Sequence, residues 1–426
     1  MEVAILTSTR ARLFRAISGR MFYGWTILSV AALAMFGTGP GQSHLIGLFF
    51  DPMQAELGLS RTQISTAYGS ATLIAALLLP RMGRLIDKFG PARMIWLIIP
   101  GVGLAAIGTS LATGWIYLAI AFGALRFLGQ GSLMMNCANI TSQWFDRKRG
   151  FALGIMALGF PISIAIHPPL TQWLIAELGW RDAWIALGLI TILALLPPAL
   201  LFLHSRPEDV GLKPDGDKIL AAGEASKSLA GFTKDEALKM PAFYILVAGM
   251  FCMSLLMTAL HVEFTGILKS HGLEPGTAAS MFTVTGITAA LMMPVIGRLL
   301  DTVPTKWMFF LGLLVQSASL ISVSLTSNTA SAVIFGIIFG VNNAITMTYV
   351  GYLWPRYFGR RHLGEIQGTG QMILIVGASV GPLPLAWAVD NWGNYDDMLR
   401  LLALAPLAMA TIVAFLLPAP NPPSSD

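Results

Sequence analysis

Long apolar stretches, separated by short polar or charged segments, recur along the whole chain. Each is about 20 residues long, which is the length that an α-helix needs to cross the hydrocarbon core of a membrane. Ten-residue segments of alternating polarity, the pattern of a membrane β-barrel, are not found in the sequence. Because helices and closed barrels alone satisfy their backbone hydrogen bonds in lipid, the pattern predicts an all-α membrane protein.

The pattern predicts twelve membrane-spanning helices. Their approximate ranges are 22–49, 63–82, 92–112, 115–142, 150–175, 182–203, 241–268, 277–297, 306–326, 329–353, 364–389 and 397–418.

Composition agrees with this prediction. The chain has 426 residues, of which 55% are hydrophobic and 12% are charged. Soluble domains carry about 25% charged residues, so this chain has too few charges to cover an ordinary water-facing surface.

The distribution of Lys and Arg predicts the orientation. Of 27 such residues, only Arg61, Arg181, Lys269 and Arg400 fall on one side, and Arg126 falls inside a span. Since cytoplasmic loops are enriched in Lys and Arg, both termini are expected in the cytoplasm, at the inner (plasma) membrane.

Two short motifs recur about half a chain apart, which indicates duplicated halves. Residues 83–87 (Gly-Arg-Leu-Ile-Asp) return as 297–301, and residues 145–148 have their counterpart at 358–361. The predicted organisation is a basic N-terminus, a first six-helix bundle, a polar cytoplasmic linker, a second six-helix bundle and a tail. These parts span residues 1–21, 22–203, 204–240, 241–418 and 419–426.

Residues 83–93 form a charged, glycine-containing turn between two spans, and they resemble the signature G-x-L-x-D-R-x-G-x-R of the major facilitator superfamily, with Lys88 in place of an Arg. The resemblance implies two six-helix bundles with a cytoplasmic latch, in which Asp87 holds a neighbouring helix and Arg93 supplies the opposing charge. Alternatively, the segment is an ordinary basic loop. The proposed gating residues are Gly83, Asp87, Gly90, Arg93, Gly297 and Asp301.

Residues 23–25 (Tyr-Gly-Trp) and the loops 144–150 and 357–364 resemble the monocarboxylate and oxalate–formate branch of that superfamily. This implies a small organic anion as substrate. The branch usually carries a cation in its eighth span, whereas residues 287–294 carry none. Carriage of an anion would therefore need another anchor.

Arg126 is the candidate anchor. It lies 11 residues after Trp115, hence about 16 Å deep in a helix that rises 1.5 Å per residue. A cation at the midplane is expensive and faces a cavity or a partner. The alternative is a structural Arg that is hydrogen-bonded to carbonyls of a neighbouring helix.

Glu263 is the carboxylate that falls clearly within a span, and His261 precedes it by two residues. A carboxylate in a low dielectric can bind and release a proton near neutral pH. We therefore expect Glu263 to couple transport to protons, with His261 as a proton or substrate ligand. Alternatively, the span ends earlier and both side chains face water.

Other polar residues in the spans are candidate substrate ligands, although packing or interhelical hydrogen bonding is the more common role of such residues. The candidates are His44, Asn136, Asn342 and Asn343.

The sequence gives no support for an enzyme. Residues 377–381 match G-x-S-x-G, but they fall inside a predicted helix instead of a strand-to-helix turn. No phosphate-binding loop is present, and Cys137 and Cys252 lie in different halves without metal-site spacing. We expect no cofactor, no metal and no nucleic-acid partner.

The function predicted from the sequence is a secondary active transporter, acting as a monomer on a small organic anion with protons or in exchange. One alternative is an exporter of drugs or neutral solutes, which the uncharged eighth span with Met281, Met292 and Met293 would suit. A second alternative is a transporter-like sensor that binds a solute but does not move it.

Overall fold

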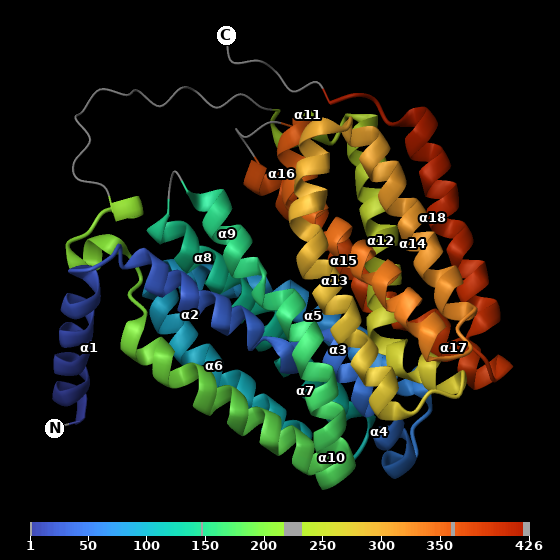
Figure 1. The fold of residues 1–426 in the computed structure, drawn as a ribbon, viewed down its shortest axis with the longest axis horizontal. Coiled ribbons are helices and arrows are strands. Elements are labelled where there is room, and N and C mark those ends of the chain that lie inside the picture. Colours follow the sequence, from blue (N-terminus) through green and yellow to red (C-terminus); the bar gives the residue numbers. More distant parts are fainter. Residues whose placement is uncertain (1, 146–147, 217–231, 359–362, 421–426) are drawn as a thin grey trace. The chain divides into compact units, whose positions relative to one another are not determined.

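The computed structural model describes residues 2–145, 148–216, 232–358 and 363–420, and within these ranges it contains helices and turns but no strand (Figure 1). The all-helical fold predicted from the sequence is confirmed.

The chain divides into two compact units. The first comprises Met1–Ile46, Ile74–Ser163 and Trp173–Gly223, and the second comprises Gly47–Leu73, Ile164–Gln172 and Glu224–Asp426. Two short segments of the first half of the sequence thus belong to the second unit. Part of the predicted linker, residues 217–231, lies outside the described residues, so the predicted linker and bundle boundaries stay predictions.

The helices of the first unit are α1 (Glu2–Ser18), α2 (Gly24–Phe36), α3 (Ser43–Ile46), α6 (Pro91–Thr109), α7 (Trp115–Leu125), α8 (Met134–Trp144), α9 (Arg149–Ala157) and most of α10 (Gly159–Phe202). Helix α5 (Arg61–Phe89) begins in the second unit and ends in the first. The other helices of the second unit are α4 (Phe50–Leu57), α11 (Lys234–Ala237), α12 (Pro241–Ser270), α13 (Pro275–Thr302), α14 (Thr305–Ser324), α15 (Thr329–Phe358), α16 (Leu363–Val380), α17 (Pro382–Trp392) and α18 (Asp396–Leu416).

Ten helices of the described chain are long and apolar enough to cross a membrane. One of them, Phe151–Phe202, covers the predicted fifth and sixth spans, and the first span is represented by the shorter Gly24–Phe36. The twelve predicted spans therefore correspond to ten long helices because two spans are merged into one helix and the first span contains a helix that is too short.

The first span is interrupted, whereas the sequence pattern predicts a continuous helix. After Phe36 the chain forms short helical turns at Gly39–Gly41 and Gly47–Phe49. Gly47 lies so close to α12 that a Cβ there would be 2.0 Å from the carbonyl oxygen of Val262. Glycine is needed at this position because no side chain would fit.

The segment 83–93 is also more helical than the predicted turn. Helix α5 continues to Phe89, Gly90 has a φ of +83°, and Pro91 begins α6. Gly83 and Asp87 lie on α5, and Gly297 and Asp301 lie on α13. The side chains of both Asp residues, and residues 146–147 and 359–362 of the second repeated motif, lie outside the described part, so the latch stays a prediction.

Small residues bring helices together inside each unit, as is usual in membranes. In the first unit, a Cβ on Gly103 would lie 2.7 Å from the carbonyl oxygen of Gly188, and a Cβ on Gly188 would lie 2.5 Å from that of Gly103. Large apolar side chains such as Leu97, Leu104 and Leu193 are exposed on the same helices. These exposed faces suit contact with lipid.

Gly179 separates the two predicted spans within α10. It has φ +79° and ψ 164°, and a Cβ there would meet no atom within 4 Å. Since this backbone region is nearly exclusive to glycine, we expect Gly179→Ala to destabilise the protein by about 1–3 kcal/mol through backbone strain alone. Thermal unfolding of the purified protein in detergent measures the loss.

The matched control is Gly154→Ala. Gly154 lies inside α9, where a Cβ also meets nothing within 4 Å. Because alanine favours a helix by up to about 1 kcal/mol over glycine, this variant should unfold at the same temperature as the native protein or slightly higher. Equal melting temperatures for both variants would contradict the kink assignment.

Candidate functional site

The second unit contains a buried ion pair. Glu263 on α12 is 0% exposed, and Arg61 at the start of α5 is 5% exposed. The Nε–H of Arg61 donates to Oε2 of Glu263 over 2.5 Å, and the hydroxyl of Tyr395 donates to the same oxygen over 2.9 Å. A buried carboxylate is thus held by a cation and a hydrogen-bond donor, as its burial requires.

The pair extends into a chain of alternating charges. Nη1 of Arg61 donates to Oδ1 of Asp51 over 2.6 Å, and Nζ of Lys269 donates to the other oxygen of Asp51. Burial raises the pKa of Asp51, but the charges and hydrogen bonds of Arg61 and Lys269 outweigh burial, and the pKa lies below its usual value. Two acids and two bases therefore neutralise each other; we call Asp51, Arg61, Glu263 and Lys269 the charge chain.

Local sequence explains how Arg61 reaches Glu263. Gly266 lies one helical turn after Glu263, and a Cβ there would be 2.4 Å from Nη2 of Arg61 and 2.7 Å from the hydroxyl of Tyr395. The rings of Phe50 and Tyr395 each lie 5.8 Å from the guanidinium carbon. Arg61 therefore occupies the space that Gly266 leaves, between two aromatic rings.

The start of α5 is fixed to the same unit by a helix cap. The backbone N–H of Thr62 donates to Oδ2 of Asp390 on α17 over 2.8 Å. This bond satisfies one of the free N–H groups at the helix N-terminus and places Arg61 beside α12.

The sequence placed Glu263 correctly inside α12, but it assigned Arg61 and Lys269 to outer loops. In the structure Arg61 is the first residue of α5 and its side chain is buried, whereas Lys269 lies in the last turn of α12; the side of the membrane on which they lie stays a prediction. The alternative in which Glu263 and His261 face water is wrong, since α12 continues to Ser270 and both side chains are buried. The need of a buried acid for a cation was the signal that could have identified Arg61.

His261 does not join Glu263. Residues two apart on a helix point to different sides, and Nδ1 of His261 lies 2.9 Å from the carbonyl oxygen of Met257. Its ring centroid lies 4.8 Å from that of Phe339. The imidazole therefore belongs to an aromatic cluster and not to the charge chain.

Arg126 lies in the first unit and is 3% exposed. Its Nη1 donates to the carbonyl oxygen of Gly41 over 3.1 Å and to Oγ of Ser43 over 3.3 Å. The residue begins a π-helical stretch, Arg126–Leu133, between α7 and α8. Such stretches are frequent at functional sites. The bond to Gly41 also agrees with the alternative that Arg126 is a structural residue hydrogen-bonded to backbone carbonyls.

Close backbone contact brings the interrupted first span to Arg126. A Cβ on Gly41 would lie 2.5 Å from the carbonyl oxygen of Leu125, and the Cα of Gly41 lies 3.0 Å from the Cβ position of Gly129. His44 follows Ser43 directly, and its Nε2 lies 3.4 Å from Oγ of Ser163. The first unit therefore places Arg126 and the His44 segment side by side.

The three predicted Asn ligands are buried and bonded within helical bundles. Asn136 donates to the Ser132 carbonyl oxygen, Asn343 donates to that of Phe339, and Asn342 donates to Oε1 of Gln316, each over 2.8 Å. The amide oxygens of all three have no hydrogen-bond partner in the described part of the chain. Among the residues described, no group of three or more His, Cys, Asp or Glu could hold a metal ion.

The family model for the Major Facilitator Superfamily matches residues 25–266 and 246–426. The chain belongs to the Major Facilitator Superfamily. This confirms the predicted fold, with its two six-helix bundles, and the resemblance stated from residues 83–93.

Two relatives from this superfamily have known substrates in their names. Monocarboxylate transporter 4 of Gallus gallus is 23% identical over 75% of this chain and 67% of its own length. The oxalate:formate antiporter of Oxalobacter formigenes is 25% identical over 63% of this chain and 59% of its own length. The predicted resemblance to this branch is confirmed.

A solved structure supports the fold. A bacterial homologue of the human lysosomal transporter Spinster is similar with a TM-score of 0.72, at 16% identity, over 92% of this chain and 96% of that one. This likeness shows the fold alone; membership of the superfamily, from the family model, makes the chain a multi-pass transporter of a small molecule.

The charge chain predicts unequal costs of removing its members. Arg61→Gln leaves Asp51 and Glu263 without their shared cation, so we expect a loss of about 3–5 kcal/mol in the free energy of unfolding. Glu263→Gln should lower the free energy of unfolding by less, because Arg61 remains paired with Asp51. Thermal unfolding in detergent compares both with Glu177→Gln, an exposed acid that should be neutral. The double variant should be more stable than Arg61→Gln alone; a double variant that is less stable would contradict the pairing.

Gly266→Ala tests the packing of Arg61. The added methyl would overlap Arg61 and Tyr395, so both must move from Glu263 and the melting temperature should fall. In the Arg61→Gln background the same change should cost less, because the overlap with the guanidinium is gone. Gly276→Ala, at a position where a Cβ meets no atom within 4 Å, is the control. An equal cost of Gly266→Ala in both backgrounds would show that Arg61 does not fill this space.

Proposed function

We propose that this superfamily member is a secondary active transporter that moves a small organic anion, such as a monocarboxylate, by alternating access, together with a proton or in exchange. It acts as a monomer in the inner (plasma) membrane with both termini in the cytoplasm. The excess of Lys and Arg on one side of the predicted spans supports this orientation.

The observation that carries the proposal is the burial of Arg126. Its guanidinium lies deep in a span, at a π-helical stretch and beside an interrupted helix. Interrupted helices expose backbone groups that bind substrates in transporters. A guanidinium binds a carboxylate through two parallel hydrogen bonds, and both relatives named above have carboxylates in their names. Arg126 would replace the cation that residues 287–294 lack.

Glu263 is proposed as the proton-coupling residue. While Arg61 donates to it, the negative charge of the carboxylate is paired with a cation; separation from Arg61 would leave a carboxylate in a low dielectric, which favours protonation. Movement of α5 against α12 would thus alternate the partner of Glu263 between Arg61 and a proton. His261, packed among aromatic rings, is proposed as a substrate contact only.

The alternative is a carrier of neutral or drug-like solutes. It is favoured by the absence of charge in residues 277–297 of α13, which also contain Met281, Met292 and Met293. Flexible methionine side chains suit varied apolar ligands.

Uptake by proteoliposomes tests the proposal. Radiolabelled lactate, pyruvate, oxalate and formate are supplied with and without an inward proton gradient. Arg126→Gln should abolish both gradient-driven uptake and exchange, because the anchor is lost. Glu263→Gln should abolish gradient-driven uptake and keep exchange of acid for acid, because exchange needs no proton.

Two surface variants, Arg84→Gln and Glu177→Gln, serve as controls, since both residues are exposed. They should transport like the native protein. If no acid enters sealed vesicles that contain folded native protein, the anion proposal is wrong, and neutral compounds become the substrates to screen.

A further inference from the structure

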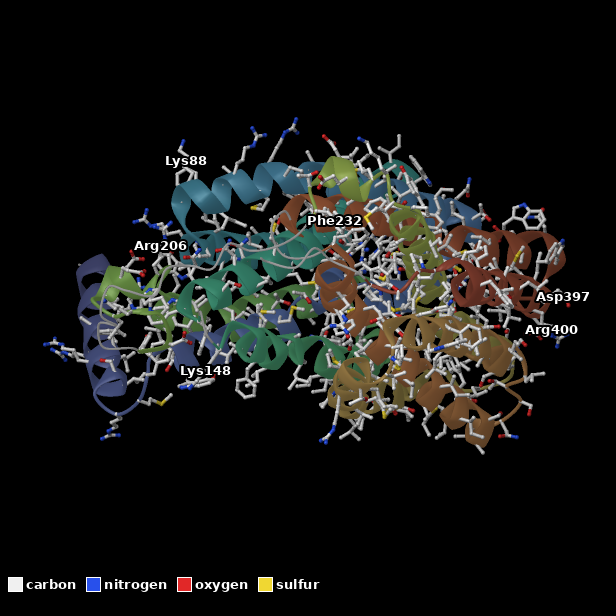
Figure 2. All side chains as sticks on the ribbon, turned by 90° about the horizontal axis from the view of Figure 1, so that it is seen from above. Lys88, Lys148, Arg206, Phe232, Asp397 and Arg400 are labelled. Carbon is white, nitrogen blue, oxygen red and sulfur yellow. The ribbon has the colours of Figure 1, made fainter. Side chains whose placement is uncertain are left out.

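A basic cavity lies in the first unit, away from Arg126 and from the charge chain. Its volume is about 470 Å³, and it is formed by α1, the end of α5, the start of α6 and the segment that follows α10. Four cations line it: Arg10, Lys88, Arg93 and Arg206. Figure 2 shows Lys88 and Arg206 at the same end of this unit.

Of the lining residues that the structure describes, one is an acid, Asp209, and it is hydrogen-bonded within its own segment. Oδ2 of Asp209 accepts the backbone N–H of Arg206 over 3.0 Å, which caps the short helical turn Pro207–Val210. Among the lining residues that the structure describes, four cations face one acid, which leaves an excess of positive charge. Helix α6 begins at Pro91 beside the cavity, and the partial positive charge of its N-terminus adds to that excess.

Two buried nitrogens in the cavity wall have no hydrogen-bond partner among the described residues. Arg10 is fixed by stacking over Trp96, 4.8 Å from the ring centroid, and its Nη2 donates to the Leu203 carbonyl oxygen over 2.7 Å. Its Nε remains without a partner, as does Nε2 of His204. Burial, and secondly the charge of Arg10, lowers the pKa of His204 to about 4, so the imidazole is neutral at pH 7. An anion with several oxygens would satisfy both nitrogens.

A second cavity, of about 320 Å³, adjoins the first and shares Arg10 and His204 with it. Its other lining residues are apolar: Ala11, Phe14 and Val210. The two cavities together therefore offer a cationic compartment next to a hydrocarbon-compatible one, at the ends of membrane-spanning helices.

We propose that the paired cavities bind an anionic phospholipid, with its phosphate among Arg10, Lys88, Arg93 and Arg206 and the start of an acyl chain against Phe14 and Val210. Clusters of Lys and Arg at the cytoplasmic ends of spans attract anionic lipids, and guanidinium groups bind phosphate oxygens in a bidentate manner. The bound lipid would fasten α1 to the ends of α5, α6 and α10.

Native mass spectrometry of the full-length protein in detergent tests the proposal. The protein is titrated with palmitoyl-oleoyl phosphatidylglycerol, with the matching phosphatidylcholine, and with inorganic phosphate. We expect phosphatidylglycerol to bind at least about tenfold more tightly than phosphatidylcholine, and Arg10→Gln/Arg206→Gln to weaken phosphatidylglycerol binding at least about tenfold, because two charge-assisted hydrogen bonds are lost.

The controls are Arg12→Gln and Arg84→Gln. They remove one charge each from α1 and α5 at exposed positions that do not line the cavities, so they should bind phosphatidylglycerol like the native protein. All variants are first checked for a single folded species by size-exclusion chromatography and thermal unfolding, so that lost binding is not lost folding.

Three results overturn the proposal. Equal affinities for the two lipids would show that the cavities do not recognise the lipid's charge. Equal phosphatidylglycerol binding by the cavity and control variants would place the lipid elsewhere. Inorganic phosphate that binds as tightly as phosphatidylglycerol, and displaces it, would make the site one for a free phosphate anion without a role for the apolar cavity.

Discussion

A carboxylate that is removed from water must find positive charge and hydrogen-bond donors within the protein, because the low dielectric makes an isolated charge very costly. Glu263 meets this demand through Arg61 and Tyr395, which come from opposite ends of the sequence. The need to stabilise this buried charge constrains the residues around Glu263. Gly266 must lack a side chain, the start of α5 must be capped by Asp390, and Asp51 and Lys269 must balance the remaining charges.

Such a pair is a poor source of stability compared with apolar packing, since desolvation consumes most of the attraction. The pair has a different property: each charged side chain is stable in the protein interior only while the oppositely charged one is beside it. A buried Leu pair at the same place would hold α5 and α12 together at any protonation state. In the proposed mechanism, the Arg61–Glu263 pair makes that contact depend on the charge of one carboxylate, as coupling to protons would require.

Much of the fold could be predicted from the sequence, because the apolar segments and the repeated motifs can be recognised along the whole chain. The membrane helices and the duplication were predicted from these patterns, and the superfamily was identified from the resemblance of residues 83–93 to its signature. The interruption of the first span was not, although Gly37, Gly39, Pro40, Gly41 and Gly47 lie within it. Hydropathy averages over such residues, and glycine is common in continuous membrane helices. Gly41 and Gly47 in the interrupted segment lie in close contact with neighbouring helices, and a single segment does not reveal such contacts.

For the candidate site, the sequence predicted which charged residues are buried but did not predict which residues they pair with. Burial of Glu263, His261 and Arg126 follows from their position inside apolar runs. Their partners are set by tertiary contact: Arg61 lies at the first residue of a helix, where the charge distribution suggests a loop, and is 202 residues from Glu263. A search for the cation that each buried acid requires would have narrowed the choice to Arg61, Arg181, Lys269 and Arg400, and two of these four belong to the charge chain. Treating a buried charge as half of an unknown pair is therefore a stronger inference than treating it as a ligand by itself.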